Sequence, residues 1–176
     1  MARGKGKANP TRPAAAQETG HTAVVEPYLH LGPCSAASNE KLLSTAGITH
    51  VLSIGATPTK TVPGITYTRL ALKDEPTADL AACVAAAAAF IDEARRRKGR
   101  VIVHCSAAIS RSPAVVAGYL ITREGYSLKR ALAIIAASRP RIAPNEGFVQ
   151  QLGDIEEHWK NVWRCTDLWR TKTTRA

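Results

Sequence analysis

An apolar run, a short loop of small residues and a helix start follow one another between residues 101 and 113. The run Val101–Val103 is typical of a buried strand. Ser112-Pro113 is typical of a helix start, because serine is a favoured N-cap and proline a favoured first helical residue. The loop between them, from His104 to Arg111, reads HCSAAISR. This strand–loop–helix order predicts an α/β fold, in which ligands bind at the carboxyl ends of parallel strands.

The loop has the composition of a phosphate-binding site that contains a reactive thiol. Backbone N–H groups at a helix N-terminus converge on an anion, and the helix dipole adds attraction. Cys105 stands near the start of the loop and Arg111 at its end. A thiol near a helix N-terminus and a cation has its pKa lowered from about 8.5 to about 3.5–7.5, so we expect Cys105 to be a thiolate that attacks phosphorus. The planar guanidinium of Arg111 suits two phosphate oxygens.

Two residues of this segment have alternative interpretations. A cysteine is often only a small buried residue, but the strand before Cys105 and the helix start after it favour a functional thiol. His104 could be a base for the nucleophile, or it could hold the loop in place through hydrogen bonds. We favour the second role for His104.

The segment from His104 to Ser112 resembles the signature loop of the cysteine-dependent protein phosphatases, in their dual-specificity form. The resemblance spans roughly residues 24–160. It implies a hydrolase that works through a phosphocysteine intermediate and requires no metal and no other cofactor. The further segments that carry the resemblance are residues 26–32, 37–43, 47–54, 74–76, 79–80, 90–94, 126–128, 139–140 and 144–148.

The same resemblance implies roles for single residues outside the nucleophile. Asp74 would protonate the leaving oxygen and then accept a proton from the water that cleaves the phosphocysteine, with Glu75 as the alternative acid. Asp79 is interpreted as a helix N-terminal acid instead. Ser112 would donate a hydrogen bond to the thiolate as it leaves. Asn145 would tie its own loop to the phosphate-binding loop, although capping of the last helix explains this asparagine equally well. The substrate phosphate would lie against Ser106, Ala107, Ala108, Ile109, Ser110 and Arg111.

Ala108 departs from the family pattern, which has glycine at this position of the loop. Glycine is used where the backbone needs a positive φ or where a ligand approaches closely. If a positive φ is needed, alanine costs about 1–3 kcal/mol. Either the loop closes under strain with reduced activity, or it opens and leaves a domain that binds phosphoproteins without hydrolysing them. Because Cys105, Arg111, Ser112 and Asp74 are all present, we favour retained activity.

The substrate class is inferred from the loop and from the charge. The side chains between Cys105 and Arg111 are neutral, which favours a monophosphate on a protein: phosphotyrosine first, with phosphoserine and phosphothreonine as further candidates. Arg139 and Arg141 are expected near the rim of the pocket. The net charge of +10 suggests acidic partners or polyanions. A nucleic-acid-binding protein is the least favoured hypothesis, because the sequence shows no aromatic platform and no DNA-reading helix.

The chain is long enough for one domain with its own core. We expect a disordered basic segment over residues 1–22, a catalytic domain over 23–163 and a basic C-terminal tail over 164–176. Paired cysteine spacings typical of zinc sites or disulfide frameworks are absent, and Cys34 and Cys83 are interpreted as small buried residues rather than as thiols that form a disulfide with an oxidised Cys105. The sequence has neither a signal peptide nor an apolar stretch long enough for a bilayer, so no membrane association is expected. The expected location is the cytoplasm, with the nucleus as the alternative, and the oligomeric state is left open.

Strand and helix patterns alternate from residue 24 onwards. The strand candidates are 28–31, 50–54, 66–70 and 101–104, and the helix candidates are 38–46, 79–98, 113–124, 127–138 and a last helix after Asn145. Such alternation predicts a central, twisted, mostly parallel sheet of about five strands, with helices on both faces.

Overall fold

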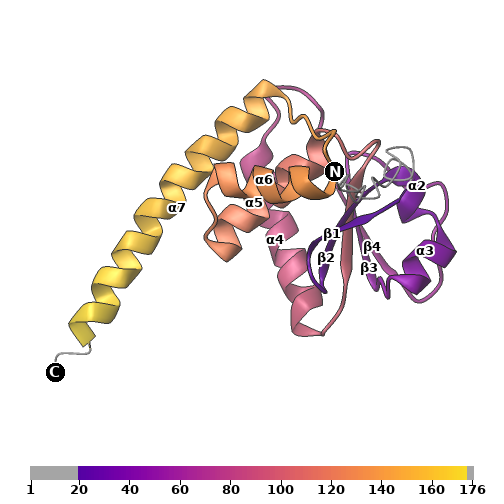
Figure 1. Cartoon of the computed structure of the whole chain (residues 1–176), viewed down its shortest axis with the longest axis horizontal. Helices are drawn as coiled ribbons and strands as arrows, with labels where there is room; N and C mark the ends of the chain where they lie inside the picture. Colours follow the sequence, from indigo (N-terminus) through magenta and orange to yellow (C-terminus); the bar gives the residue numbers. More distant parts are fainter. Residues whose placement is uncertain (1–19, 174–176) are drawn as a thin grey trace, which may run out of the picture.

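Five strands form one sheet in the computed structural model, which describes residues 20–173 (Figure 1). Their order across the sheet is β1-β2-β5-β3-β4. Strand β1 runs antiparallel to β2, and the other neighbouring pairs are parallel. The predicted mostly parallel sheet is confirmed. The strands are β1 (Thr22–Val25), β2 (Leu29–Pro33), β3 (His50–Ile54), β4 (Thr66–Leu70) and β5 (Val101–Cys105).

Strand β5 lies in the middle of the sheet, and all five of its residues are buried. Valine and isoleucine favour strands, and a strand covered on both faces carries a continuous apolar run. The register places Pro33 of β2 opposite Cys105, and Ser53 of β3 opposite His104. Residues from both neighbouring strands therefore flank the carboxyl end of β5, where the loop begins.

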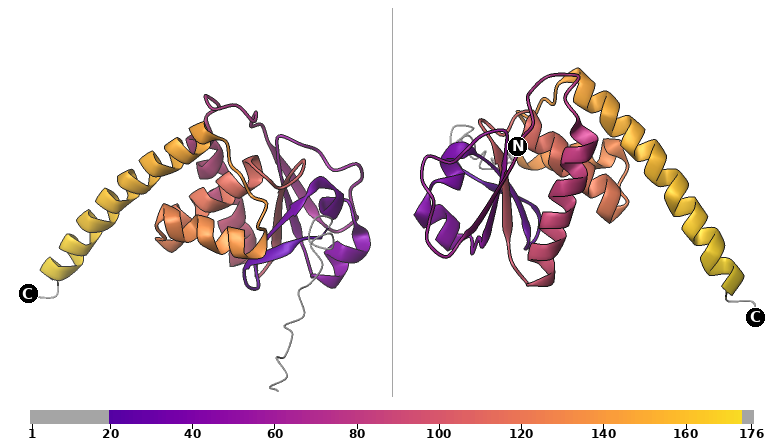
Figure 2. Two further views of the ribbon diagram at one scale, coloured as in Figure 1. Left: turned by 45° about the horizontal axis from the view of Figure 1, so that its top comes forward. Right: turned by 180° about the vertical axis from the view of Figure 1, so that it is seen from behind.

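Helices cover both faces of the sheet, as predicted (Figures 1 and 2). The short helices α2 and α3 pack on one face, and α4 to α7 lie on the other. Helix α5 is buried from Ser112 to Thr122, which confirms the predicted central helix. Within residues 20–173, no helix combines the length and the apolar character that a membrane span needs. The helices are α2 (Cys34–Ala37), α3 (Glu40–Thr45), α4 (Leu80–Arg96), α5 (Arg111–Glu124), α6 (Leu128–Ser138) and α7 (Glu146–Thr173).

The ends of the chain differ from the predicted element list. The expected disordered segment lies outside the described residues as far as residue 19, but β1 begins at Thr22. Two side chains at the end of α6 anchor this stretch: Arg139 Nη1 donates to Gly20 O at 3.0 Å, and Ser138 Oγ donates to Ala23 O at 3.2 Å. At the other end, α7 continues to Thr173, into the segment named as a basic tail.

Two predicted helix starts were wrong for local reasons. The helix expected over 38–46 begins at Glu40, because the side chain of Asn39 accepts from Leu42 N at 3.1 Å and caps it. The separate turn α2 before it was not predicted. Helix α5 begins at Arg111, with Ser110 at the N-cap position, although the sequence suggested a start at Pro113. The second difference changes which side chains remain available at the site, because it concerns Ser110 and Ser112.

Helix α4 ends on a lysine in the left-handed conformation. Lys98 has φ +58°, and the N–H groups of Lys98 and Gly99 donate to Arg95 O and Ala94 O at 2.9 and 2.8 Å. This is a Schellman end, in which glycine usually takes the left-handed position. Gly99 serves another purpose, because a Cβ there would lie 2.7 Å from Thr49 Oγ1.

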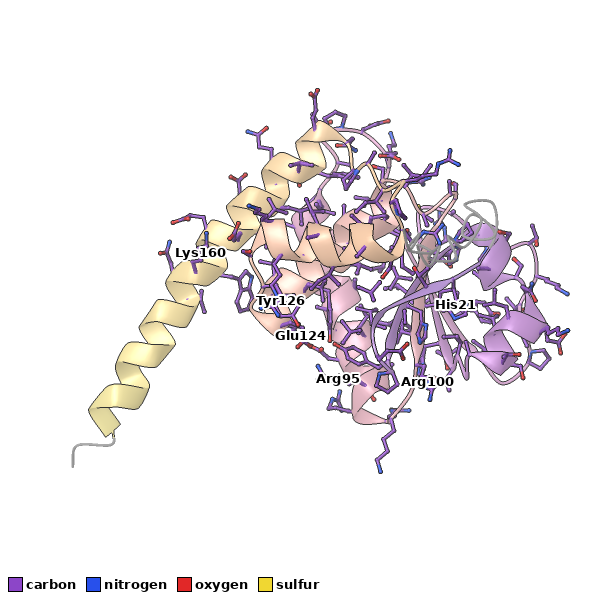
Figure 3. All side chains as sticks on the ribbon, in the orientation of Figure 1. His21, Arg95, Arg100, Glu124, Tyr126 and Lys160 are labelled. Carbon is purple, nitrogen blue, oxygen red and sulfur yellow. The ribbon has the colours of Figure 1, made fainter. Side chains whose placement is uncertain are left out.

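The cluster of arginines after residue 94 lies at the end of the molecule opposite the loop. Arg95 donates to Glu124 at 2.8 Å, at the last residue of α5, whereas the loop joins the first residue of that helix (Figure 3). Arg96 and Arg97 both pair with Glu93. These three arginines are therefore paired and remote from the loop.

Candidate active site

The loop from β5 to α5 brings the predicted thiol and guanidinium together. Cys105 is the last residue of β5 and is only 3% exposed, while Arg111 is the first residue of α5. Arg111 Nη2 donates to Ser106 Oγ at 2.9 Å, so the guanidinium folds back over the residue that follows the cysteine. The first N–H groups of a helix have no partner within the helix. A thiol, a guanidinium and free helix N–H groups thus share one short loop.

The loop is held from both sides through its carbonyl groups. Cys34 N–H donates to Ser106 O at 3.1 Å, and Ala143 N–H donates to Ile109 O at 2.8 Å. In a trans peptide the C=O and the next N–H point in opposite directions. The N–H groups that follow these two carbonyls therefore point away from the flanking segments. This orientation suits the binding of an anion inside the loop.

Arg111 contains a buried donor that makes no hydrogen bond. Its Nε is buried without a hydrogen bond and lies 3.6 Å from Asp74 Oδ2. An unsatisfied buried donor is costly, and a bound phosphate oxygen would satisfy it. Gly55 makes room for this side chain, because a Cβ there would lie 2.5 Å from Arg111 Nη1. The sequence analysis missed Gly55, although a glycine directly after a buried strand is a recognisable sign of a close approach.

Ser112 makes the contact with the thiol that was predicted for it, although its place in the helix differs from the predicted one. It is the second residue of α5 rather than the N-cap, and its Oγ donates to Cys105 Sγ at 3.2 Å. Ser110 occupies the N-cap position, but its side chain makes no capping hydrogen bond. The start of α5 therefore leaves both hydroxyl groups free to contact other site residues.

Asp74 lies beside the loop in the segment between β4 and α4. Its Oδ1 accepts from Ser110 Oγ at 2.6 Å and from Asn145 Nδ2 at 3.0 Å. The side chain remains 41% exposed, so it can exchange protons with solvent. Glu75, the alternative acid, is 58% exposed and lies 3.9 Å from Lys73. The geometry favours Asp74 as the acid near the loop.

Asn145 satisfies both of its predicted interpretations. Its Oδ1 accepts from Phe148 N at 2.9 Å and caps α7, while its Nδ2 donates to Asp74. Its backbone N–H also donates to Ser110 Oγ at 3.1 Å. Capping fixes the side-chain orientation that presents the amide to Asp74. Asp79, by contrast, caps α4 by accepting from Ala82 N at 2.9 Å, which agrees with its assignment to a helix start.

His104 is fully buried between two strands, and both of its ring nitrogens have partners. Nδ1 lies 3.2 Å from Cys105 O, which can only accept, so Nδ1 carries the proton. Nε2 then accepts from Ser53 Oγ at 2.7 Å. Burial lowers the pKa of His104, which keeps the ring neutral. This geometry supports the role of holding the loop. The sequence analysis did not identify Ser53 as the partner of His104. The signal that could have found it is a single polar residue inside an apolar strand.

Replacing His104 by asparagine should change the pH dependence of stability. Burial holds the pKa of His104 below its usual 6.5, so the unfolded chain takes up this proton first as the pH falls. The stability that the neutral ring contributes is present above pH 6.5 and is lost as the pH falls through the lower folded pKa. Urea unfolding measures the free energy of unfolding at each pH. Between pH 7.5 and 5 this free energy should fall less in the variant than in the native chain, by about 1.4 kcal/mol for each unit by which the folded and unfolded pKa values of His104 differ. Equal slopes would contradict this, because the other histidines titrate in both proteins.

Ala108 adopts the left-handed backbone conformation that was considered for this position of the loop. Its φ is +57°, and the residue is 2% exposed. Left-handed backbone costs an L-residue about 1–2 kcal/mol. The loop nevertheless closes, because the contacts of Cys105 with Ser112 and of Arg111 with Ser106 are formed. The open loop that the sequence allowed as an alternative is not observed.

The sequence analysis expected Arg139 near the rim of the pocket. In the structure it is not an exposed residue of that rim. Its side chain is nearly buried and binds Gly20 O, and burial lowers its pKa. Its guanidinium anchors the segment before β1. Arg141 is exposed. Among the residues whose side chains are described, no group of three or more His, Cys, Asp or Glu is arranged to hold a metal ion.

A thiol and a guanidinium at the carboxyl end of the central strand are the arrangement of a cysteine-dependent phosphatase. Comparison with known proteins supports this class. Residues 29–158 match the family described as "Dual specificity phosphatase, catalytic domain". Dual specificity protein phosphatase 1 of Arabidopsis thaliana is 35% identical over 136 residues, which are 77% of this chain and 69% of the plant protein.

Solved structures show the same fold. A mouse putative dual specificity phosphatase, crystallised with zinc tungstate, superposes with a TM-score of 0.76 at 30% identity, over 91% of this chain and 96% of the mouse chain. The human tyrosine phosphatase-like serine/threonine/tyrosine-interacting protein superposes with a TM-score of 0.73 at 33% identity, over 80% and 98% of the two chains. The chain belongs to the dual specificity phosphatases, a family of protein phosphatases. It spans 69%, 59% and 57% of the length of three curated relatives that it matches.

Proposed function

We propose that this chain hydrolyses phosphotyrosine in proteins, and phosphoserine and phosphothreonine as further substrates, through a phosphocysteine intermediate. The observation that carries the proposal is the loop itself. Cys105 Sγ and Arg111 Nε, which makes no hydrogen bond, flank a turn whose N–H groups point away from its supports, and Asp74 lies at its edge. Membership of the family supports the same reaction.

The reaction follows from the placement of these groups. The phosphate binds to the loop N–H groups and to Arg111, and the Cys105 thiolate attacks phosphorus in line with the leaving oxygen. Asp74 donates its proton to that oxygen, which completes the release of the dephosphorylated side chain. Asp74 then accepts a proton from a water molecule that attacks the phosphocysteine. The products are inorganic phosphate and the thiolate, which the Ser112 hydroxyl stabilises by hydrogen bonding.

The neutral loop supports a monophosphate substrate. Between Cys105 and Arg111 the side chains carry no charge, so the loop offers one guanidinium to one phosphate group. A substrate with several phosphates would need further cations close by. Arg139 is not available for this purpose, because it binds Gly20 O.

Trapping of the intermediate tests the proposed function. The full chain should release the alcohol of an aryl phosphate in the presence of a metal chelator, because the mechanism needs no metal. Acid quenching during turnover should leave a phosphate group on the peptide that contains Cys105, detectable by mass spectrometry. Turnover without this adduct, or turnover that depends on an added divalent metal, would contradict the mechanism.

A phosphoprotein-binding domain with little turnover is the second candidate, and the strained Ala108 is the observation that favours it. One structural neighbour is a phosphatase-like interacting protein, which agrees with such a role. In this candidate the Ala108 methyl group, rather than an open loop, would obstruct the binding of the transition state. The two candidates differ in their response to one substitution.

Ala108→Gly should change turnover by less than about threefold if the closed loop is already competent. Relief of the left-handed strain, about 1–2 kcal/mol, is offset by the lost buried methyl group and by the extra freedom of glycine in the unfolded chain. Lys98→Gly is the matched control, because Lys98 has the same positive φ at an exposed position remote from the site. It should stabilise the chain by about 0.5–1 kcal/mol with no change in turnover. Turnover that is negligible in the native chain and restored by Ala108→Gly alone would support the binding domain instead.

A further inference from the structure

The segment that carries Asp74, residues 74–79, is held by the beginning of helix α7. We call these residues the acid segment. The N-terminal ends of α4 and α7 lie side by side (Figures 1 and 2), and the side-chain amide of Gln151 joins them. Its Nε2 donates to Pro76 O at 3.2 Å and to Ala78 O at 3.0 Å, and its Oε1 accepts from Leu80 N at 3.0 Å. One side chain of α7 therefore binds three backbone groups, two in the acid segment and one at the first residue of α4.

A primary amide matches all three partners of Gln151. Two carbonyl oxygens need N–H donors and one N–H needs an acceptor, and glutamine offers two donors and a carbonyl oxygen. A glutamate would place negative oxygens against the two carbonyl groups, and a lysine offers no acceptor. The N–H of Leu80 is one of the first N–H groups of α4, which have no partner within the helix. Gln151 satisfies this group from outside, while Asp79 satisfies that of Ala82 from within the chain.

The backbones of α7 and of the acid segment also touch directly, at Gly147. Residues four positions apart share one face of a helix, so Gly147 and Gln151 face the same neighbour. A Cβ at Gly147 would overlap Pro76 O and Pro76 Cα, which are both backbone atoms. Only glycine leaves room for this approach. The contact shows that the acid segment cannot move towards α7 without displacing the helix.

These contacts bear on the carboxyl group of Asp74, which lies two residues before Pro76. Proline restricts the backbone of the residue before it, so Glu75 has little freedom to absorb a shift of Pro76. The N–H of Ala78 donates to Glu75 O at 3.1 Å, which makes residues 75–78 one turn. A displacement of this turn is therefore transmitted to Asp74. At its own position, Asp74 is bound by Asn145, the cap of α7, at 3.0 Å.

We propose that Gln151 is a positioning residue for the proton transfer by Asp74. The proposal rests on the proposed function, because it needs Asp74 to be the acid. Gln151 acts through the backbone of Pro76 and Ala78. A proton is transferred between heavy atoms about 2.6–3.2 Å apart, and a misplacement of about 1 Å can cost about 10²-fold in rate. Loss of the Gln151 hydrogen bonds should therefore slow the protonation of the leaving oxygen, while phosphate binding and attack by the thiolate continue.

Gln151→Met is the central variant, and Gln150→Met is its matched control. Methionine has a similar length and makes none of the three hydrogen bonds, and it suits the largely apolar cavity between α4, α5 and α7 that Gln151 lines. Gln150 is the exposed neighbour on the same helix. In Gln151→Met, kcat for phenyl phosphate should fall about tenfold with KM changed by less than about twofold. The kcat for a nitrophenyl phosphate, whose leaving oxygen needs no proton, should fall less than about threefold. Gln150→Met should leave both values unchanged.

A double variant separates positioning of the acid from a general loss of structure. Asp74→Asn has no proton to donate, so the addition of Gln151→Met should lower its turnover of phenyl phosphate by less than about twofold. A merely structural role would lower turnover by the same factor in both backgrounds. An equal tenfold loss with and without the Asp74 carboxyl would therefore overturn the proposal.

Gly147→Ala tests the same coupling without altering the Gln151 amide. The added Cβ must displace Pro76, so the loss should again be larger for phenyl phosphate than for the nitrophenyl ester. Gly153→Ala is the control, because an added Cβ there meets open space and alanine favours the helix at both positions. Circular dichroism establishes that each variant is folded. If Gln151→Met does not fold, Gly147→Ala decides the question, and native turnover in the folded Gly147→Ala chain would overturn the proposal.

Hydrogen exchange measures the hold on the acid segment without turnover. A peptide covering residues 74–82 should exchange its amides faster in Gln151→Met than in the native chain, and at the native rate in Gln150→Met. Unchanged exchange, or an equal loss for both esters, would contradict the role of Gln151 alone. Absence of turnover in the native chain would contradict the proposed function itself, and the positioning role with it.

Discussion

Cys105→Ser should lower the turnover of an aryl phosphate by roughly 10⁴-fold or more while phosphate binding persists. A serine hydroxyl is a weak nucleophile unless a base activates it, and in the first step of the proposed mechanism Asp74 acts as the acid. Both ring nitrogens of His104 are engaged, with Ser53 and with the backbone. The loop N–H groups and Arg111 are unchanged by the substitution, so a phosphotyrosine peptide should still bind. Steady-state assays and calorimetry measure the two properties separately.

Cys83→Ala is the control for removal of a thiol as such. Cys83 is buried in α4 and contacts no group of the loop in the proposed mechanism, so its replacement should leave turnover intact. Turnover that survives Cys105→Ser would refute the covalent mechanism. Loss of both turnover and binding, with a folded chain, would show that the thiolate is also needed to shape the loop.

The strand, loop and helix of the site could be predicted because their signals are local. Val101–Val103 is apolar without interruption, and Pro113 restricts the chain within one turn of the helix start. The position of the thiol at the end of a strand follows from these neighbours alone. The exact first residue of α5 could not be predicted in this way, because Ser110 and Ser112 are both serines and equally good N-cap residues. Only their contacts, with Asp74 and with Cys105, distinguish them.

Features that depend on distant parts of the chain could not be predicted. Strand β1 is short and half-buried, and its order depends on Arg139 and Ser138, which are more than 100 positions away in sequence. The same holds for Cys34. The sequence suggested only that Cys34 is a small buried residue. Its position beside Cys105 follows from the register of β2 with β5. Register is set by the packing of whole strands, which no single motif encodes.

The positive φ of Ala108 is an intermediate case. The expectation of glycine at this position indicated where the backbone could be left-handed, and the structure has φ +57° there. The sequence could not decide whether alanine would adopt it. The loop closes because its ends are held independently, through Cys34 and Ala143. A strained residue is tolerated where its surroundings determine the conformation.

Asp74→Asn should produce the second large loss, and its size should depend on the leaving group. An amide cannot donate the proton that an alkoxide-like leaving oxygen needs, so turnover of a phosphotyrosine peptide or phenyl phosphate should fall about 10²–10³-fold. A nitrophenyl phosphate, whose leaving oxygen is stable as an anion, should lose less than about tenfold. Asparagine keeps an oxygen that can accept from Ser110 and Asn145, so the loop geometry should be preserved.

Glu75→Gln separates the two acids of this segment. Glu75 lies beside Lys73 on the exposed side of the loop, so its replacement should change turnover by less than about twofold for either substrate. Rates of a series of aryl phosphates, plotted against the acidity of the leaving phenol, should be steeper for Asp74→Asn than for the native chain and Glu75→Gln. The steeper dependence arises because negative charge then accumulates on an unprotonated oxygen in the transition state. Equal slopes for the native chain and Asp74→Asn would show that Asp74 positions the loop through Ser110 and Asn145 without transferring a proton.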